Sequence, residues 1–197
     1  MDYELCVPAI VRRAEQLFPG KAILSRRADG GWQRSTYADV LARAKQLGRA
    51  LQDELGLVAG DRVATLCWNH ADHLVAYLGV PASGLVVHTL NPRLHPDDLS
   101  YIASHAGDRV LVADKSLWQL VEATRPRSPF EHVIAVGEGP TPDGAIELDA
   151  LLADRSSDVA FPDLDERSAA AMCYTSGTTG RPKGVLYSHR AIVLHSL

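Results

Sequence analysis

The chain is poor in cysteine and offers no arrangement of cysteines that would form a disulfide framework. It holds three in 197 residues, Cys6, Cys67 and Cys173, which lie far apart and form no Cys-x-x-Cys pair. Cys67 and Cys173 lie in apolar, strand-like runs, which favours reduced and buried thiols. The first 18 residues begin with acidic side chains and contain no apolar core of a signal peptide. We therefore expect a cytoplasmic protein with free thiols.

Long apolar runs and basic clusters are also missing. No uninterrupted apolar stretch reaches 18 residues, so the sequence predicts no transmembrane helix. The formal net charge is −4, and no basic patch is interleaved with aromatic residues, which argues against nucleic acid as a partner. The hydrophobic share of 46% and the charged share of 22% are instead typical of a globular domain with a core.

Side chains for metal binding or acid–base chemistry are scattered. His70 and His73 are three residues apart and could share a helix face, but no third ligand is near, so we expect no metal site. His189 lies close to the loop described below and could contact a substrate or pack at a helix start. No pair of carboxylates suggests general acid–base catalysis.

Apolar patterning predicts an α/β fold with a mostly parallel sheet of β-α-β units and helices on both faces. A small β-hairpin is expected near the N-terminus, where residues 22–27 and 32–35 flank Asp29-Gly30-Gly31. The predicted helices cover residues 4–18, 36–55, 71–78, 97–105, 116–123 and 146–152. A further helix is predicted to begin near His189, with Ile192, Val193 and Leu197 facing the sheet. The predicted strands cover residues 62–68, 85–89, 109–113 and 132–136.

The most informative stretch is the run YTSGTTGRPKG at residues 174–184. It places hydroxyl side chains, glycines and one lysine between two apolar runs. Glycine lets a backbone turn and approach a ligand closely, while N–H groups, hydroxyls and a lysine ammonium donate to phosphate oxygens. Some of the hydroxyls could serve only the turn's own backbone. The run predicts a polyphosphate-binding loop formed by Thr175, Ser176, Gly177, Thr178, Thr179, Gly180 and Lys183.

Two common phosphate motifs do not fit this run. The P-loop needs a lysine after glycine and then Ser or Thr, whereas Lys183 precedes Gly184. The dinucleotide fingerprint fails because the spacing of Gly177, Gly180 and Gly184 differs from G-x-G-x-x-G. The run instead resembles the phosphate loop of the adenylate-forming (AMP-binding) enzymes, which include acyl-CoA synthetases, peptide-synthetase adenylation domains and beetle luciferases.

The resemblance extends beyond the loop. Residues 60–114 resemble the N-terminal half of medium- and long-chain fatty acyl-CoA synthetases, and HTLNPRL at residues 88–94 is especially similar to that branch. GVLYSHRAIVLHSL, which begins at Gly184, resembles the strand and helix that follow the loop. The resemblance implies that residues 1–197 are the N-terminal portion of the large AMP-binding domain, and that the C-terminal domain is not among them.

The implied function is that of a fatty acid–CoA ligase (AMP-forming). A carboxylate would attack the α-phosphate of ATP to give acyl-adenylate and pyrophosphate, and coenzyme A would then displace AMP. By this resemblance Lys183 is the catalytic residue that neutralises the β- and γ-phosphates, and the complete enzyme uses ATP, Mg²⁺, coenzyme A and a fatty acid.

The resemblance also implies parts that these residues do not contain. They are a Thr-Glu pair for Mg²⁺, a ribose-binding aspartate, an adenine-binding segment and a C-terminal lysine. We therefore expect no ligase activity from this chain alone. Two alternatives stay open. The first is a non-catalytic folded or partner-binding module, which includes a homodimer. The second is an adenylating enzyme with another acceptor, such as an amino-acid adenylation domain or a luciferase-like oxygenase.

Overall fold

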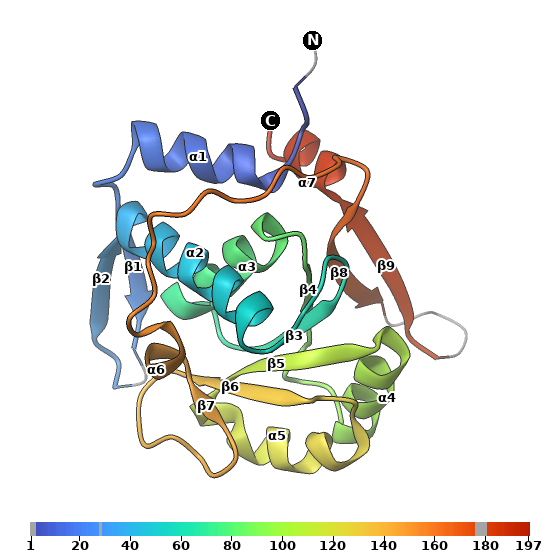
Figure 1. The fold of residues 1–197 in the computed structure, drawn as a ribbon. Coiled ribbons are helices and arrows are strands. Elements are labelled where there is room, and N and C mark those ends of the chain that lie inside the picture. Colours follow the sequence, from blue (N-terminus) through green and yellow to red (C-terminus); the bar gives the residue numbers. More distant parts are fainter. Residues whose placement is uncertain (1–2, 28, 176–180) are drawn as a thin grey trace.

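A central sheet organises the molecule in the computed structural model, which describes residues 3–27, 29–175 and 181–197. Within those residues the sheet has seven strands (Figure 1). In spatial order they are β7 (Ile146–Glu147), β6 (His132–Val136), β5 (Asp108–Asp114), β3 (Arg62–Leu66), β4 (Val86–Thr89), β8 (Ala169–Thr175) and β9 (Lys183–Ser188). All neighbours pair in parallel except β8 and β9, which confirms the predicted mostly parallel sheet.

Helices cover both faces of this sheet, as the alternation of elements predicts. One face packs against α2 (Tyr37–Asp53), α3 (Ala71–Ala82) and α6 (Leu148–Leu152), and the other packs against α4 (Pro96–Ala106) and α5 (Trp118–Thr124). Neighbouring strand residues divide between the two cores: Val63 belongs to the first, and Ala64 belongs to the second. This alternation follows from the two-residue period of a strand.

Helix α2 begins with a capping box and packs closely on α3. Thr36 accepts from the Asp39 backbone N–H, while the Asp39 carboxylate accepts from the Thr36 backbone N–H at 2.8 Å. The predicted apolar side of the helix is buried, namely Val40, Leu41, Ala44, Leu47, Ala50 and Leu51. A Cβ placed on Gly79 of α3 would lie 2.5 Å from the Ala44 carbonyl oxygen, so glycine permits the backbones of the two helices to touch.

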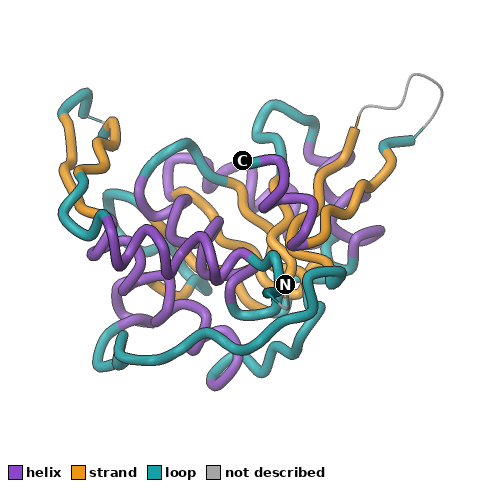
Figure 2. Tube along the Cα trace, turned by 90° about the horizontal axis from the view of Figure 1, so that it is seen from above, coloured by secondary structure: helices purple, strands orange, loops and turns teal. Residues whose placement is uncertain are grey.

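The predicted hairpin is also present and stands apart from the main sheet. Strands β1 (Ala22–Arg26) and β2 (Trp32–Thr36) pair antiparallel. Viewed from above, this hairpin and the β8–β9 hairpin lie on opposite sides of the molecule (Figure 2). The hairpin therefore does not contribute to the site built by β8 and β9.

The two ends of the chain pack together. Helix α1 (Val7–Leu17) lies beside α7 (His189–His195) (Figure 1). The backbone N–H of Val7 donates to Nδ1 of His189 at 3.3 Å, and His189 is fully buried. Helix-start packing, and not substrate contact, is therefore the role of His189. Burial lowers the pKa of its imidazole.

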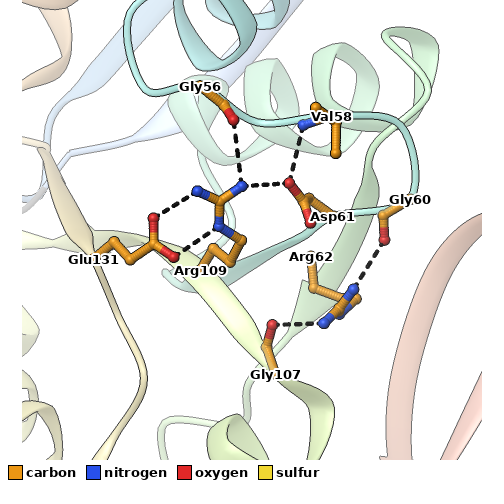
Figure 3. A network of polar contacts seen from close by, with 8 residues as sticks. All are labelled: Gly56, Val58, Gly60, Asp61, Arg62, Gly107, Arg109 and Glu131. Carbon is orange, nitrogen blue, oxygen red and sulfur yellow. Dashed lines mark hydrogen bonds and ion pairs between the residues drawn. The ribbon is translucent and has the colours of Figure 1, made fainter.

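A polar network fixes the amino ends of β3 and β5 (Figure 3). Arg109 donates to Asp61 at 2.6 Å and to both carboxylate oxygens of Glu131 at 2.6 and 2.8 Å. Hydrogen bonds from Arg109 lower the pKa of Glu131. Arg62 donates to the carbonyl of Gly107 at 2.9 Å and to that of Ala106 at 2.8 Å, so β3 holds the C-terminal end of α4.

Several predicted boundaries and orientations were wrong. Helix α1 starts at Val7 and not at residue 4, because Cys6 is extended and Pro8 lies in the first turn, where proline is tolerated. The segment predicted as a helix over 146–152 starts with β7, which pairs with β6 before α6 begins. Leu197 does not face the sheet, since 95% of it is exposed. Cys173 is only partly buried, although Cys6 and Cys67 are buried as expected.

Candidate phosphate-binding site

The predicted loop joins β8 to β9 at the edge of the sheet. Five of its predicted binding residues, Ser176, Gly177, Thr178, Thr179 and Gly180, lie outside the described residues. The two that are described, Thr175 and Lys183, face one another as antiparallel partners at the ends of β8 and β9. Residues that lie directly opposite in an antiparallel pair share a face, with Cβ atoms about 5 Å apart. A hydroxyl and an ammonium group therefore lie together on one side of the sheet, and both residues are exposed.

The position of the loop agrees with ligand binding in open α/β sheets. Thr175 ends β8, which runs parallel to β4, so the loop leaves from the carboxyl edge of the parallel strands. Ligands of such sheets bind outside that edge. Side chains alternate along a strand, so Tyr174 lies on the opposite face from Thr175.

Tyr174 packs beneath the base of the loop. It is the partner of Gly184, and a Cβ on Gly184 would lie 3.1 Å from the Tyr174 ring. Glycine at this position therefore lets the ring lie across β9. Nδ1 of His105, near the end of α4, lies 2.6 Å from the Tyr174 hydroxyl. Burial and the charge of Asp108 raise the pKa of the Tyr174 phenol, so its hydroxyl keeps its proton at neutral pH.

A fully buried His–Asp pair lies behind Tyr174. Nδ1 of His88 on β4 lies 2.9 Å from both carboxylate oxygens of Asp108 on β5, and both side chains have no exposed surface. Strand β3 lies between the two strands, and on it Ala64 is the register partner of His88 while Arg62 is that of Asp108. Burial raises the pKa of Asp108 against the opposing effect of the His88 hydrogen bond. The His88 ring lies 5.2 Å from the Tyr174 ring, and its Nε2 has no partner among the described residues.

Comparison with known proteins identifies the family. The family described as AMP-binding enzyme matches residues 11–196. The chain belongs to the AMP-binding enzyme family. This confirms the resemblance inferred from the loop and from residues 60–114.

Among similar members of the AMP-binding family, a long-chain-fatty-acid–CoA ligase of Thermus thermophilus is 46% identical over the whole chain. A 3-methylmercaptopropionyl-CoA ligase of Ruegeria pomeroyi is 41% identical, again over the whole chain. The chain spans 36% and 37% of the lengths of these two relatives. The chain is also similar to the crystal structure of the anthranilate CoA ligase AuaEII in complex with anthranoyl-AMP. The match covers 96% of this chain and 36% of the ligase chain, with a TM-score of 0.86 at 25% identity.

His70 and His73 each have a side-chain hydrogen-bond partner in the structure. Nε2 of His70 lies 3.0 Å from the Asp114 carboxylate, and Nε2 of His73 lies 3.1 Å from the Thr65 hydroxyl. Burial opposes ionisation of Asp114, but hydrogen bonds from His70 and Ser116 outweigh it and lower its pKa. Among the described residues, no three His, Cys, Asp or Glu side chains gather as metal ligands. In the same part of the chain, no helix is long and apolar enough to cross a membrane.

A hollow of about 280 Å³ opens at the carboxyl ends of β3, β5 and β6. Its lining includes Trp68, Asn69, His70, Asp114 and Gly137. Helix α3 leaves β3 toward one face and α5 leaves β5 toward the other, so the hollow lies at a point where the chain changes faces. Such points are common ligand crevices in α/β sheets.

The residues under the loop carry little signal in their local sequence. His88 lies within the apolar strand VVHT, and Asp108 starts β5, two positions before the apolar run at residues 110–113. A polar pair is indicated by a histidine at an inward strand position together with an aspartate at a buried strand start. The local sequence does not say which strands are neighbours, and only the order of the sheet brings these two within reach. His105 ends the predicted helix at residues 97–105, and nothing in its local sequence points to Tyr174.

Proposed function

We propose that this chain supplies the phosphate-binding part of an AMP-forming fatty acid–CoA ligase. The observation that carries the proposal is the pairing of Thr175 with Lys183 across the base of the loop, at the carboxyl edge of a sheet of the AMP-binding family. The 46% identity to a long-chain-fatty-acid–CoA ligase supports the substrate class. Residues 1–197 would be the N-terminal portion of the large AMP-binding domain.

In the first step, the fatty acid carboxylate attacks the α-phosphate of ATP, and pyrophosphate leaves. Charge gathers on the leaving group, and preorganised donors stabilise it most when they are already in place. Lys183 supplies a positive charge at the β- and γ-phosphates. Thr175, Ser176, Gly177, Thr178, Thr179 and Gly180 supply hydroxyl and backbone donors to the same oxygens. The thiol of coenzyme A then displaces AMP from the acyl-adenylate.

Magnesium enters this proposal as part of the MgATP substrate. The described residues bring no cluster of metal-ligand side chains together. The free thiols Cys6, Cys67 and Cys173 support a reducing compartment, the cytoplasm, as the place of action. The 197 residues alone should form no acyl-CoA, because the expected adenine, ribose and late lysine contacts are not among them.

A chimera tests the proposal. This chain would replace the matching 36% of the Thermus thermophilus ligase, and fatty-acid-dependent exchange of pyrophosphate into ATP would be measured. Exchange with medium- and long-chain fatty acids, but not with amino acids, is expected. Exchange with amino acids alone would favour an amino-acid adenylating enzyme. No exchange with any acid, from a chimera that folds and melts cooperatively, would count against the ligase proposal.

One observation favours a second candidate, a partner-binding module. Strand β9 is at the edge of the sheet, and Val185, Leu186 and Tyr187 on it are 38%, 58% and 43% exposed. Exposed apolar side chains on an open edge favour strand addition or self-association, including a homodimer. Light scattering of the purified chain tests this candidate, which predicts a concentration-dependent increase in mass, whereas a monomer at all concentrations would exclude self-association.

A further inference from the structure

Helix α4 carries two stacked rings next to Tyr174, at the base of the loop. Tyr101 and His105 are four residues apart on α4, so they lie on the same face of the helix. Their ring centroids are 5.6 Å apart, with an angle of 30° between the planes. Tyr101 is partly buried against the core under α4, while His105 is exposed.

Each ring contacts a different stem of the loop. His105 pairs with the hydroxyl of Tyr174, which directly precedes the loop, at 2.6 Å, and the two rings meet edge to face at 5.9 Å. Tyr101 lies under the guanidinium of Arg181, with 4.9 Å from the Arg181 Cζ to the ring centroid. Arg181 follows residues 176–180 and precedes Lys183 by two positions. One helix therefore contacts the chain on both sides of the loop.

Hydrogen bonds from β3 hold the end of this helix. Arg62 on β3 donates to the carbonyls of Ala106 and Gly107, directly after His105, and Figure 3 shows the bond to Gly107. Beneath Tyr174 lies the buried pair of His88 and Asp108. The neighbours of His105 and Tyr174 are held by these contacts. The two side chains can therefore restrict the loop to a narrower range of positions than strand pairing alone would.

We propose that Tyr101 and His105 are positioning residues that hold the two stems of the loop and set its affinity for phosphate groups. We call this pair the α4 clamp. The proposal rests on the proposed function of the loop, and it adds two residues outside the loop that touch neither phosphate nor the reacting atoms. Their effect on binding passes through Tyr174 and Arg181.

The chemistry of the two contacts supplies matched variants. Tyr101→Leu removes the aromatic face but keeps an apolar side chain, whereas Tyr101→Phe keeps the face for Arg181. His105→Ala removes the partner of Tyr174, whereas His105→Asn restores a polar group close to the position of Nδ1. Because His105 is exposed, its variants should fold even if Tyr101→Leu does not.

Two measurements on the purified chain test the clamp. The first is amide hydrogen exchange at Thr175 and Lys183, followed residue by residue by NMR, which requires no ligand. The second is the affinity for inorganic tripolyphosphate by calorimetry. We expect Tyr101→Leu and His105→Ala to speed exchange at both amides and to weaken tripolyphosphate binding about three- to tenfold, with unchanged melting temperature. Tyr101→Phe and His105→Asn should lie close to wild type.

The outcomes separate the clamp from the function beneath it. Unchanged exchange in Tyr101→Leu and His105→Ala would overturn the clamp, whatever the affinity. Two results would overturn the link from the clamp to phosphate. One is faster amide exchange with an unchanged affinity for tripolyphosphate. The other is faster amide exchange in a chain whose tripolyphosphate binding does not depend on Lys183. Failure of the ligase function would appear elsewhere, as a chimera that folds but exchanges no pyrophosphate with any acid.

Discussion

Replacing Gly79 by alanine tests the close packing of α2 on α3, which forms the layer over one face of the sheet. The new Cβ would lie 2.5 Å from the Ala44 carbonyl oxygen and 3.0 Å from the Ala44 Cα, where ordinary contact begins at 3.4 Å. Helix α3 would have to move outward by about 0.9 Å to restore that contact. The obstacle is backbone, which cannot rotate away as a flexible side chain could.

The magnitude follows from two opposing terms. Overpacking a well-packed core costs about 1–3 kcal/mol, and alanine in place of glycine within a helix returns about 1 kcal/mol. Because the clash is with backbone, we expect the cost near its upper end and a net loss of about 1–2 kcal/mol in the free energy of unfolding. For a chain of this size that loss lowers the melting temperature by about 2–8 °C.

Urea denaturation followed by circular dichroism measures this loss. Gly20→Ala is the matched control, because nothing lies within 4 Å of its Cβ position, and its free energy of unfolding should stay within about 0.5 kcal/mol of wild type. If Gly79→Ala were as stable as the control, α2 and α3 would not be packed backbone to backbone.

Three further changes should alter stability in stated directions. Burial lowers the pKa of His189, so below about pH 6.5 the unfolded chain binds a proton that the folded chain excludes. The free energy of unfolding should therefore fall as the pH drops from 7.5 to 5.5. A His189→Asn variant whose free energy of unfolding has the same dependence on pH would contradict this. Asp108→Leu leaves His88 buried without its partner and should cost about 1–3 kcal/mol, while adding His88→Leu should recover part of that loss in a double-mutant cycle. Thr36→Ala removes the acceptor for the Asp39 backbone N–H and should cost about 1 kcal/mol in denaturant unfolding, and a loss under 0.3 kcal/mol would show that the capping box contributes little.

Much of the fold could be predicted because its elements carry local patterns. The capping pair Thr36 and Asp39, the apolar side of α2 and the Asp29-Gly30-Gly31 turn each specify their own structure without distant contacts. One error occurred where tertiary pairing overrides local pattern. Residues 146–147 have a helix-like sequence around them, but β6 offers an open edge with which they pair.

The loop itself could be predicted, since its composition and order are unusual over a short run. Its surroundings could not, because they come from strands and helices that are distant in sequence. Asp108 reaches His88 only because β3 lies between β5 and β4 in the sheet. His105 meets Tyr174 across 69 positions of sequence, and no local pattern encodes that contact.

In the proposed AMP-forming ligase, Lys183 stabilises the leaving pyrophosphate. The most direct test is fatty-acid-dependent pyrophosphate exchange into ATP by the chimera, compared with its Lys183→Ala variant and with Lys21→Ala, an exposed lysine before β1, as control. We expect Lys183→Ala to lower the exchange rate on the order of 10²-fold, as for loss of one transition-state donor, while Lys21→Ala changes nothing. An exchange rate in Lys183→Ala equal to that of the control would remove Lys183 from the mechanism and contradict the account.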